Sequence, residues 1–253
     1  MTVRLVVGAT AEDVARLAAD AVVDAIGGLD APLLGVATGS SPLGLYSELA
    51  VLVRSGRLSL ARASLFALDE YVGLGRNDPA SYAAFVDTNV AIPLGVDRDR
   101  VFVPNGVVAD LDKEAFGYEA ALRRAGGVDV QIVGIGSNGH LGFNEPGSDL
   151  DSRTRVVALS QSTRVDNARY FGGRVDAVPS AAITQGLATI GSARSIVLVA
   201  QGQRKARAIS DALEGKVTAE CPASVLQRHS RVTVVLDEEA AGMLSQRPPV
   251  VGV

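Results

Sequence analysis

A histidine and a carboxylate lie in one glycine-rich segment, residues 134–146, which reads Gly-Ile-Gly-Ser-Asn-Gly-His-Leu-Gly-Phe-Asn-Glu-Pro. The segment follows the apolar run 128–133, which predicts a buried strand. His140 can transfer protons near neutral pH, and Glu145 can orient the imidazole and stabilise its protonated form. The glycines allow the backbone to approach a ligand closely. We interpret this segment as a catalytic loop.

A second candidate acid, Asp69, directly follows the apolar stretch 64–68. Acids after a strand often cap a helix, but the next residues, Tyr71 to Gly73, give no clear helix start. Because the carboxyl ends of parallel strands share one edge of a sheet, Asp69 is expected to face the same crevice as His140. A carboxylate and an imidazole in separate environments can remove a proton from carbon and deliver one to oxygen.

Small and hydroxyl-bearing residues at a strand-to-helix junction indicate a phosphate site. Thr38, Gly39, Ser40 and Ser41 have these properties and follow the predicted strand 33–37. They lack the Gly-Lys-Ser/Thr of a P-loop, so a nucleoside triphosphate is not implied. Arg169 and Lys205 could bring positive charge to the same phosphate, although each taken singly also fits a solvated helix residue.

Two other motifs favour structural readings. Gly134-x-Gly136-x-x-Gly139 formally matches the dinucleotide fingerprint, which requires a helix that begins within the glycines. The glycines, asparagine and proline of 142–147 disfavour that helix. The second histidine, His229, lacks comparable surroundings and is expected to be structural or on a pocket wall.

Strand-length apolar runs alternate with helical periodicity almost from end to end. This alternation predicts an α/β fold with a doubly wound, mainly parallel sheet and helices on both faces, a Rossmann-like arrangement of three layers. Without repeats or long linkers, residues 1–253 are expected to form one domain. Helices are predicted over 80–90 and 163–171, and a short acidic one from Asp237.

Composition excludes several classes of protein. The net charge of -4 disfavours a nucleic-acid partner, and no apolar run approaches the ~20 residues that span a bilayer. One cysteine excludes an internal disulfide, and with only two histidines a His/Cys zinc site is not expected. The sequence therefore predicts a cytoplasmic protein without a metal.

The chain resembles the glucosamine-6-phosphate deaminases, also called glucosamine-6-phosphate isomerases, in order along essentially its whole length. The most specific matches are Asp69-Glu-Tyr71 and Gly139-His-x-x-Phe-Asn-Glu-Pro146. The related 6-phosphogluconolactonases share the fold and a Gly-His loop but differ after the histidine. Further matching segments are 37–42, 68–74, 79–82, 152–155, 163–164, 168–171 and 178–179.

The resemblance implies that glucosamine 6-phosphate and water are converted to fructose 6-phosphate and ammonia, without metal or organic cofactor. His140 would open the pyranose ring, Glu145 would orient and stabilise its imidazole, and Asp69 would move the C2 proton to C1. The substrate would be a small sugar phosphate, and the segment around 155–184 resembles a mobile lid. Positions that match substrate or phosphate binding are Thr38, Gly39, Ser40, Ser41, Gly139, Arg169 and Lys205.

Asn138 stands where many family members have an aspartate of the catalytic proton network. An asparagine can hold the imidazole by hydrogen bonding but adds no charge, which moves the expected pH profile. Other members are similar at this position, so Asn138 is expected to serve the catalytic network without inactivating it.

A second departure concerns regulation. Hexameric members bind N-acetylglucosamine 6-phosphate between subunits through a Ser-Ser pair and an Arg-x-Lys. Here these positions read Ser148-Asp149 and Arg155-Val-Val157, so a lysine is lost and an acid is placed near the phosphate. The chain end is also short beside the hexameric forms. We expect the effector site to be absent and the assembly to be a monomer or small homo-oligomer.

Three other functions remain open. A deaminase for galactosamine 6-phosphate would use the same catalytic residues and differ only in the contact with the C4 hydroxyl. A lactonase is disfavoured by Asp69-Glu-Tyr71 and by residues 143–146. A sugar-phosphate sensor of transcriptional regulators would need no base and would normally carry a DNA-binding domain, for which the sequence offers no candidate.

Overall fold

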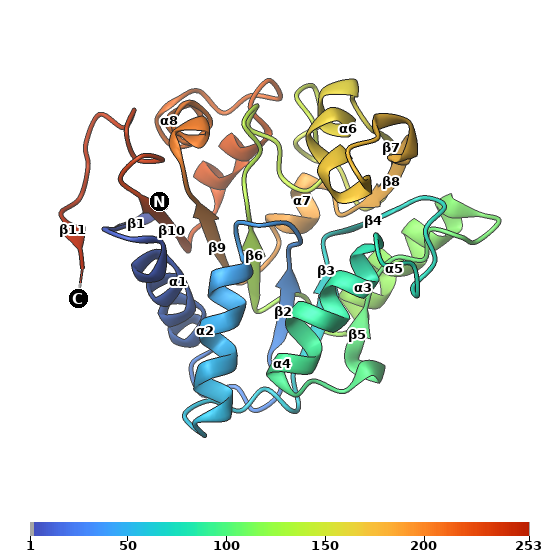
Figure 1. Ribbon diagram of the computed structural model, residues 1–253, viewed down its shortest axis with the longest axis horizontal. Helices are drawn as coiled ribbons and strands as arrows, with labels where there is room; N and C mark the ends of the chain where they lie inside the picture. Colours follow the sequence, from blue (N-terminus) through green and yellow to red (C-terminus); the bar gives the residue numbers. More distant parts are fainter. Residues whose placement is uncertain (1–2, 253) are drawn as a thin grey trace.

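An eight-stranded sheet, parallel at each pairing, forms the centre of the computed structural model, which describes residues 3–252 (Figure 1). The strand order is β11-β1-β10-β9-β6-β2-β3-β5. The strands are β1 Val3–Gly8, β2 Leu33–Val36, β3 Ser64–Ala67, β5 Val101–Phe102, β6 Val130–Val133, β9 Ser195–Ala200, β10 Val232–Asp237 and β11 Val250–Val251.

Both faces of this sheet are covered by helices, because successive side chains of a strand point to opposite faces. Leu34, Val36 and Val199 pack with one group of helices, while Ile196 and Leu198 pack with the other. The first group comprises α1 Ala11–Ile26, α2 Leu43–Arg54, α3 Tyr82–Val86 and α4 Ile92–Leu94, and the second α5 Leu111–Arg124, α7 Leu187–Ile190 and α8 Ala206–Glu214. The predicted doubly wound, three-layer α/β fold is confirmed.

A second, three-stranded antiparallel sheet was not predicted from the sequence. It consists of β4 Asp69–Tyr71, β8 Ala181–Thr184 and β7 Arg155–Ala158, in the order β4-β8-β7. The chain passes from the main sheet into it through the single residue Leu68. The Leu68 N–H donates to the Val36 carbonyl at 3.0 Å, and its carbonyl accepts from the Gln185 N–H at 2.7 Å. Asp69 is therefore the first residue beyond the main sheet.

The segment between β7 and β8 forms a small helical unit, coloured yellow in Figure 1. It contains α6 Gln161–Asn167 and the 3₁₀ turns η3 Ala168–Phe171 and η4 Val175–Ala177. Its apolar residues Leu159, Ala168 and Val178 pack with Tyr71 of β4 and with Phe143. The segment is thus held against the strand that carries Asp69.

Two predicted helices differ in the structure. The helix predicted over 80–90 is α3 followed by a π-helix, η1 Asp87–Ala91, and then by α4. The acidic helix predicted from Asp237 is wrong, and turns follow β10 instead. The Asp237 carboxylate accepts hydrogen bonds from the N–H groups of Gly202 and Ala240, and Glu239 accepts one from Gln203, so these acids fasten a neighbouring loop.

In the part of the chain that the structure describes, no helix has the length and apolar character needed to cross a membrane.

Glu70 joins β4 to the start of α3. Its carboxylate accepts hydrogen bonds from the backbone N–H groups of Tyr71 at 2.8 Å, Tyr82 at 3.0 Å and Ala83 at 2.8 Å. Burial raises the pKa of Glu70, although the three donors act to lower it. The side chain is buried, so its loss leaves backbone donors without partners.

The variant Glu70→Gln is expected to lower the free energy of unfolding by about 2 kcal/mol, because an amide NH₂ replaces one of the two accepting oxygens. Urea denaturation measures this change, and Glu220→Gln at an exposed position is the control. Equal stability of both variants would contradict the role assigned to Glu70.

Candidate active site

The strand order creates a switch point between β2 and β6. From β2 the chain continues to β3 and β5 on one side, and from β6 it continues to β9 and β10 on the other. Loops that leave the carboxyl ends of such neighbours diverge and open a crevice. Residues 38–41 follow β2 and residues 134–140 follow β6, and both segments line one cavity of about 690 Å³.

Most of the predicted site residues line this cavity, and a smaller group lies outside its lining. Asn138, Gly139 and Glu145 belong to the smaller group. Those that line the cavity are Thr38, Gly39, Ser40, Ser41, Asp69, His140, Arg169 and Lys205.

Gly139 was expected at the substrate, but its conformation indicates a backbone role. Its φ is +85°, in the left-handed region that favours glycine. A Cβ at this position would lie 2.8 Å from the Cys221 Sγ atom. Gly139 therefore lets the loop turn tightly before His140.

Asp69 is almost completely buried, with 4% of its surface exposed, yet it lines the cavity. Burial raises its pKa well above the usual value, and the nearby Glu70 carboxylate adds to this shift. The histidine loop passes directly against it, since a Cβ on Gly142 would lie 3.1 Å from Asp69 Oδ2. A carboxylate with a raised pKa in a cavity is suited to accept and return a proton.

His140 and Glu145 face each other but are not in hydrogen-bond contact. Nδ1 of His140 lies 3.7 Å from Oε2 of Glu145 and is buried without a hydrogen-bond partner. Three other side chains contact the carboxylate: Asn138 donates to Oε2 at 2.8 Å, Thr163 donates to Oε1, and the Ser160 hydroxyl lies 3.2 Å from Oε1. Glu145 can hold a positive charge that forms on the imidazole.

These contacts decide the ionisation of Glu145. Burial acts to raise its pKa, but the facing imidazole and the hydrogen bonds from Thr163 and Asn138 outweigh burial and lower the pKa to about 2. Glu145 is therefore an anion throughout the neutral pH range.

Asn138 contributes differently from the expectation. Its Oδ1 accepts a hydrogen bond from the backbone N–H of His140 at 3.2 Å, and its amide NH₂ donates to Glu145. The expected bond to the imidazole ring is absent from these described contacts, because the side chain turns toward the loop backbone. Asn138 thus bonds both the His140 backbone and the Glu145 carboxylate, and it lies outside the lining of the cavity.

Two cationic residues, Arg169 and Lys205, also line the cavity. Burial lowers the pKa of Lys205, the nearby Arg204 and Arg169 lower it further, and Asp166 acts in the opposite direction. The Arg169 guanidinium also lies 4.8 Å from the centre of the Tyr170 ring. Like charges that face one cavity beside the hydroxyls of 38–41 form a site for an anion.

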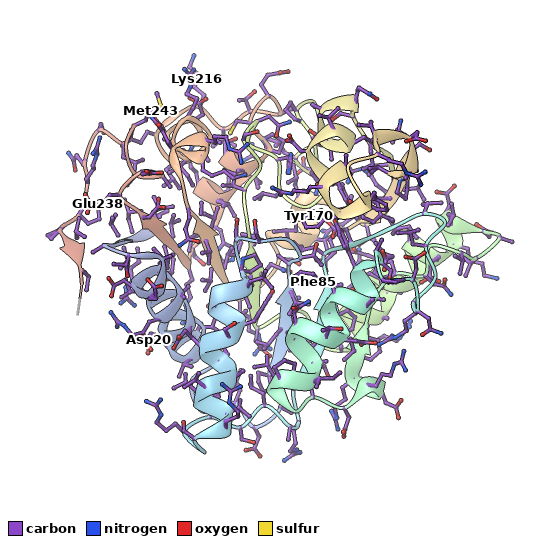
Figure 2. All side chains as sticks on the ribbon, in the orientation of Figure 1. Asp20, Phe85, Tyr170, Lys216, Glu238 and Met243 are labelled. Atoms are coloured by element: carbon purple, nitrogen blue, oxygen red, sulfur yellow. The ribbon has the colours of Figure 1, made fainter. Side chains whose placement is uncertain are left out.

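Figure 2 labels two residues that enclose the cavity, Tyr170 of η3 and Phe85 of α3. Neither was predicted from the sequence, nor were the polar residues after β9 and β10 other than Lys205. Only position in the sequence could have indicated the polar residues after β9. The loop that begins at Gln201 follows a fully apolar strand, as the predicted loops 38–41 and 134–146 do. The additional polar residues that line the cavity include Asp166, Asn167, Gln201, Gln203, Arg204 and Glu239.

Within residues 3–252, no group of three or more His, Cys, Asp or Glu side chains is arranged to hold a metal ion.

The family described as glucosamine-6-phosphate isomerases/6-phosphogluconolactonase matches residues 7–235. The chain belongs to this family. A glucosamine-6-phosphate deaminase of Cutibacterium acnes is 51% identical over 232 residues, which cover 92% of this chain and 88% of the relative. One of Rhodococcus jostii is 53% identical over 211 residues, which cover 83% and 81%.

Solved structures of the family resemble the fold closely. A monomeric glucosamine-6-phosphate deaminase superposes with a TM-score of 0.91 at 40% identity, and the match covers 95% of this chain and 99% of that one. A 6-phosphogluconolactonase from Trypanosoma cruzi gives a TM-score of 0.77 at 18% identity, with 97% and 98% covered. The second likeness shows the common fold alone.

The lowered pKa of Glu145 predicts a pH-dependent contribution to stability. A carboxylate whose folded-state pKa lies below its usual 4.5 stabilises the fold above that value, and the contribution is lost as pH falls toward about 2. The difference in unfolding free energy between the native chain and Glu145→Gln should therefore shrink by about 2 kcal/mol from pH 6 to pH 3.

Chemical denaturation at both pH values measures this difference. The exposed Glu238, labelled in Figure 2, provides the matched variant Glu238→Gln. A difference for Glu145→Gln that stays constant with pH would show that its contacts do not favour the carboxylate.

Proposed function

We propose that this chain is a glucosamine-6-phosphate deaminase, which converts glucosamine 6-phosphate and water to fructose 6-phosphate and ammonia. The observation that carries the proposal is one cavity lined by the buried Asp69, by His140, whose imidazole faces Glu145, and by the residues of an anion site. Relatives of about half identity that are named for this activity support it. The solved lactonase structure, at 18% identity, supports the shared fold and no lactonase activity.

The phosphate of the substrate binds where cationic side chains line the cavity. Arg169 and Lys205 supply charge, and the hydroxyls and N–H groups of 38–41 supply hydrogen bonds. A dianion held away from the reacting carbons fixes the sugar, so that binding energy is used to orient C1 and C2.

His140 opens the pyranose ring. It takes the proton from the C1 hydroxyl and gives one to the ring oxygen, which leaves a free aldehyde at C1. Glu145 stays ionised and stabilises the imidazolium that forms between these two transfers.

Asp69 then moves one proton between carbons. It removes the proton from C2 while the aldehyde oxygen O1 takes a proton from the C2 ammonium group, which gives an enolamine, and it then returns its proton to C1. The raised pKa of the buried carboxylate makes it a stronger base than an exposed aspartate. The resulting C2 imine adds water and expels ammonia, which leaves the C2 ketone of fructose 6-phosphate.

The assembly, location and motion of the protein are parts of the same proposal. We propose a single domain that acts as a monomer or small homo-oligomer in the cytoplasm, with residues 155–184 as a lid that closes over the enolamine. The monomeric state of a related deaminase with a TM-score of 0.91 supports the proposed monomer.

The direct test supplies glucosamine 6-phosphate without added metal and measures ammonia and fructose 6-phosphate. Galactosamine 6-phosphate and 6-phosphogluconolactone are the parallel substrates. Equal amounts of both products from the glucosamine sugar alone are expected, and turnover of the lactone alone would contradict the proposal.

Two variants separate the chemical step from binding. Asp69→Asn should lower kcat by about 100-fold or more, because the base is lost, while inorganic phosphate still binds. Lys205→Ala should raise KM by about 10-fold, because one charge-assisted contact with the phosphate is removed. Steady-state kinetics with a phosphate competition assay measures both, and retained turnover of Asp69→Asn would exclude it as the base.

The regulatory prediction concerns Arg155, which already has partners within the chain. Its guanidinium donates to Asn144 at 2.8 Å and to Ser148 at 3.4 Å, and Asp149 lies close enough to act on its charge. We expect hyperbolic kinetics that N-acetylglucosamine 6-phosphate leaves unchanged. Initial rates with and without this compound test the point, and cooperativity that it abolishes would contradict it.

A further inference from the structure

We propose that Thr163, together with Ser160, is a positioning residue that completes the hydrogen bonding of the Glu145 carboxylate. Through this contact, the residues that bind the phosphate are coupled to the acid/base pair His140 and Glu145. The inference rests on the proposed deaminase function and assigns a role to a side chain that the reaction itself does not require.

The geometry places two hydroxyl groups of another chain segment on one oxygen of Glu145. Thr163 donates its hydroxyl hydrogen to Oε1, and the Ser160 hydroxyl lies 3.2 Å from the same oxygen. The other oxygen, Oε2, accepts a hydrogen bond from the Asn138 amide and faces the imidazole of His140. Each carboxylate oxygen therefore has its own set of partners, one from the histidine loop and one from α6.

Thr163 is held firmly in this position. It is buried, lines the cavity and belongs to the first turn of α6. Its backbone N–H donates to the Ser160 hydroxyl at 3.1 Å, so the cap of the helix and the contact with Glu145 use the same serine. If α6 moves, both hydroxyls leave the carboxylate together.

The same helical unit reaches the anion site at its other end. Asn167 ends α6 and donates to the Tyr71 hydroxyl on β4 at 2.9 Å, and Arg169 in the following turn lines the cavity. A phosphate that binds Arg169 therefore stabilises the position of α6 in which Thr163 contacts Glu145. Binding energy at the phosphate is in this way used to orient the acid/base pair.

Loss of the Thr163 hydroxyl has two expected consequences for Glu145. The carboxylate loses a donor while it stays buried, which raises its pKa. It also becomes free to turn away from Nδ1 of His140, which has no other partner. The substitution leaves in place the other charged groups that line this cavity, which are Asp69, Asp166, Arg169, Arg204, Lys205 and Glu239.

The chain offers a matched control in Thr189. Its hydroxyl donates to the carboxylate of Glu119 at 2.8 Å, and both residues are buried as Thr163 is. Glu119 and Thr189 do not line the cavity. Thr189→Val thus removes a buried bond between a threonine and a carboxylate without touching the site.

The experiment compares Thr163→Val, Thr163→Ser and Thr189→Val with the native chain. Thr163→Val should lower kcat for glucosamine 6-phosphate by about 10- to 100-fold, because a misplaced acid/base group is costly. The pKa of its Glu145 carboxyl should rise by about one to two units, because a hydrogen bond to a charged group is lost. Thr163→Ser should restore both properties, and Thr189→Val should leave both at their native values.

A binding measurement distinguishes positioning from general damage to the lid. The acyclic amino-alditol 6-phosphate, which needs no ring opening, should bind Thr163→Val within about threefold of the native affinity. An affinity that falls in proportion to kcat would overturn the proposal, since Thr163 would then only hold the lid in place.

A second readout is independent of turnover. Titration of the ¹³C-labelled glutamate carboxyls by NMR, with the Glu145 signal identified by its loss in Glu145→Gln, should show a higher pKa in Thr163→Val than in the native chain. If the native chain fails to release ammonia, the proposed function fails while this titration still decides the role of Thr163. An unchanged Glu145 signal rejects that role.

Discussion

The site depends on the point where the chain leaves the main sheet. Leu68 bonds on one side to β2 and on the other to Gln185, so the strand that begins as β3 becomes the first strand of the second sheet one residue later. This transition places the Asp69 carboxylate at the boundary between the two sheets, where it is buried and still faces the cavity. Burial of an ionisable acid is unfavourable, and here it yields a carboxyl group with a raised pKa.

The second sheet also determines which elements join the strand that carries Asp69. β8 pairs with β4, β7 pairs with β8, and α6 is the helix of the segment that joins β7 to β8. Asp69 and α6 therefore belong to one small structure. The two carboxylates of the site differ because their partners differ. Burial beside Glu70 raises the pKa of Asp69, whereas the facing imidazole and the hydrogen bonds from Thr163 and Asn138 lower the pKa of Glu145. Such a separation fits the proposed roles, proton removal for Asp69 and charge stabilisation for Glu145.

Much of the fold could be predicted because its core strands are apolar and its helices periodic. The strand predicted over 33–37 is observed as β2 Leu33–Val36, and the loops at the switch point followed from the strands before them. The antiparallel sheet could not be predicted in this way. β4 is three residues long and polar at its start, and β8 has four residues, so neither shows the alternation that marks a strand. Their pairing depends on a contact between residues 69 and 184, far apart in sequence.

Some of the predicted site residues could likewise be identified from sequence, whereas the contacts of others depend on the folded structure. Residue type and position after a strand identified Asp69 and His140, while the support for Glu145 from α6 depends on tertiary contacts. Asn138 was predicted to bond the imidazole, but it bonds the His140 backbone, because the side chain is directed by a turn that sequence does not specify. Gly139 matched a binding position, yet its φ and its approach to Cys221 explain it as a turn residue.

The central claim is that Asp69 transfers a proton between C2 and C1. The most direct measurement is the reaction of unlabelled glucosamine 6-phosphate in D₂O, with the C1 position of the fructose 6-phosphate observed by NMR. The account predicts deuterium at one of the two C1 hydrogens in part of the product, because the acid formed on Asp69 can exchange with water in the cavity before it returns its proton. Complete absence of deuterium from C1 would indicate a hydride shift without a base and would contradict the account.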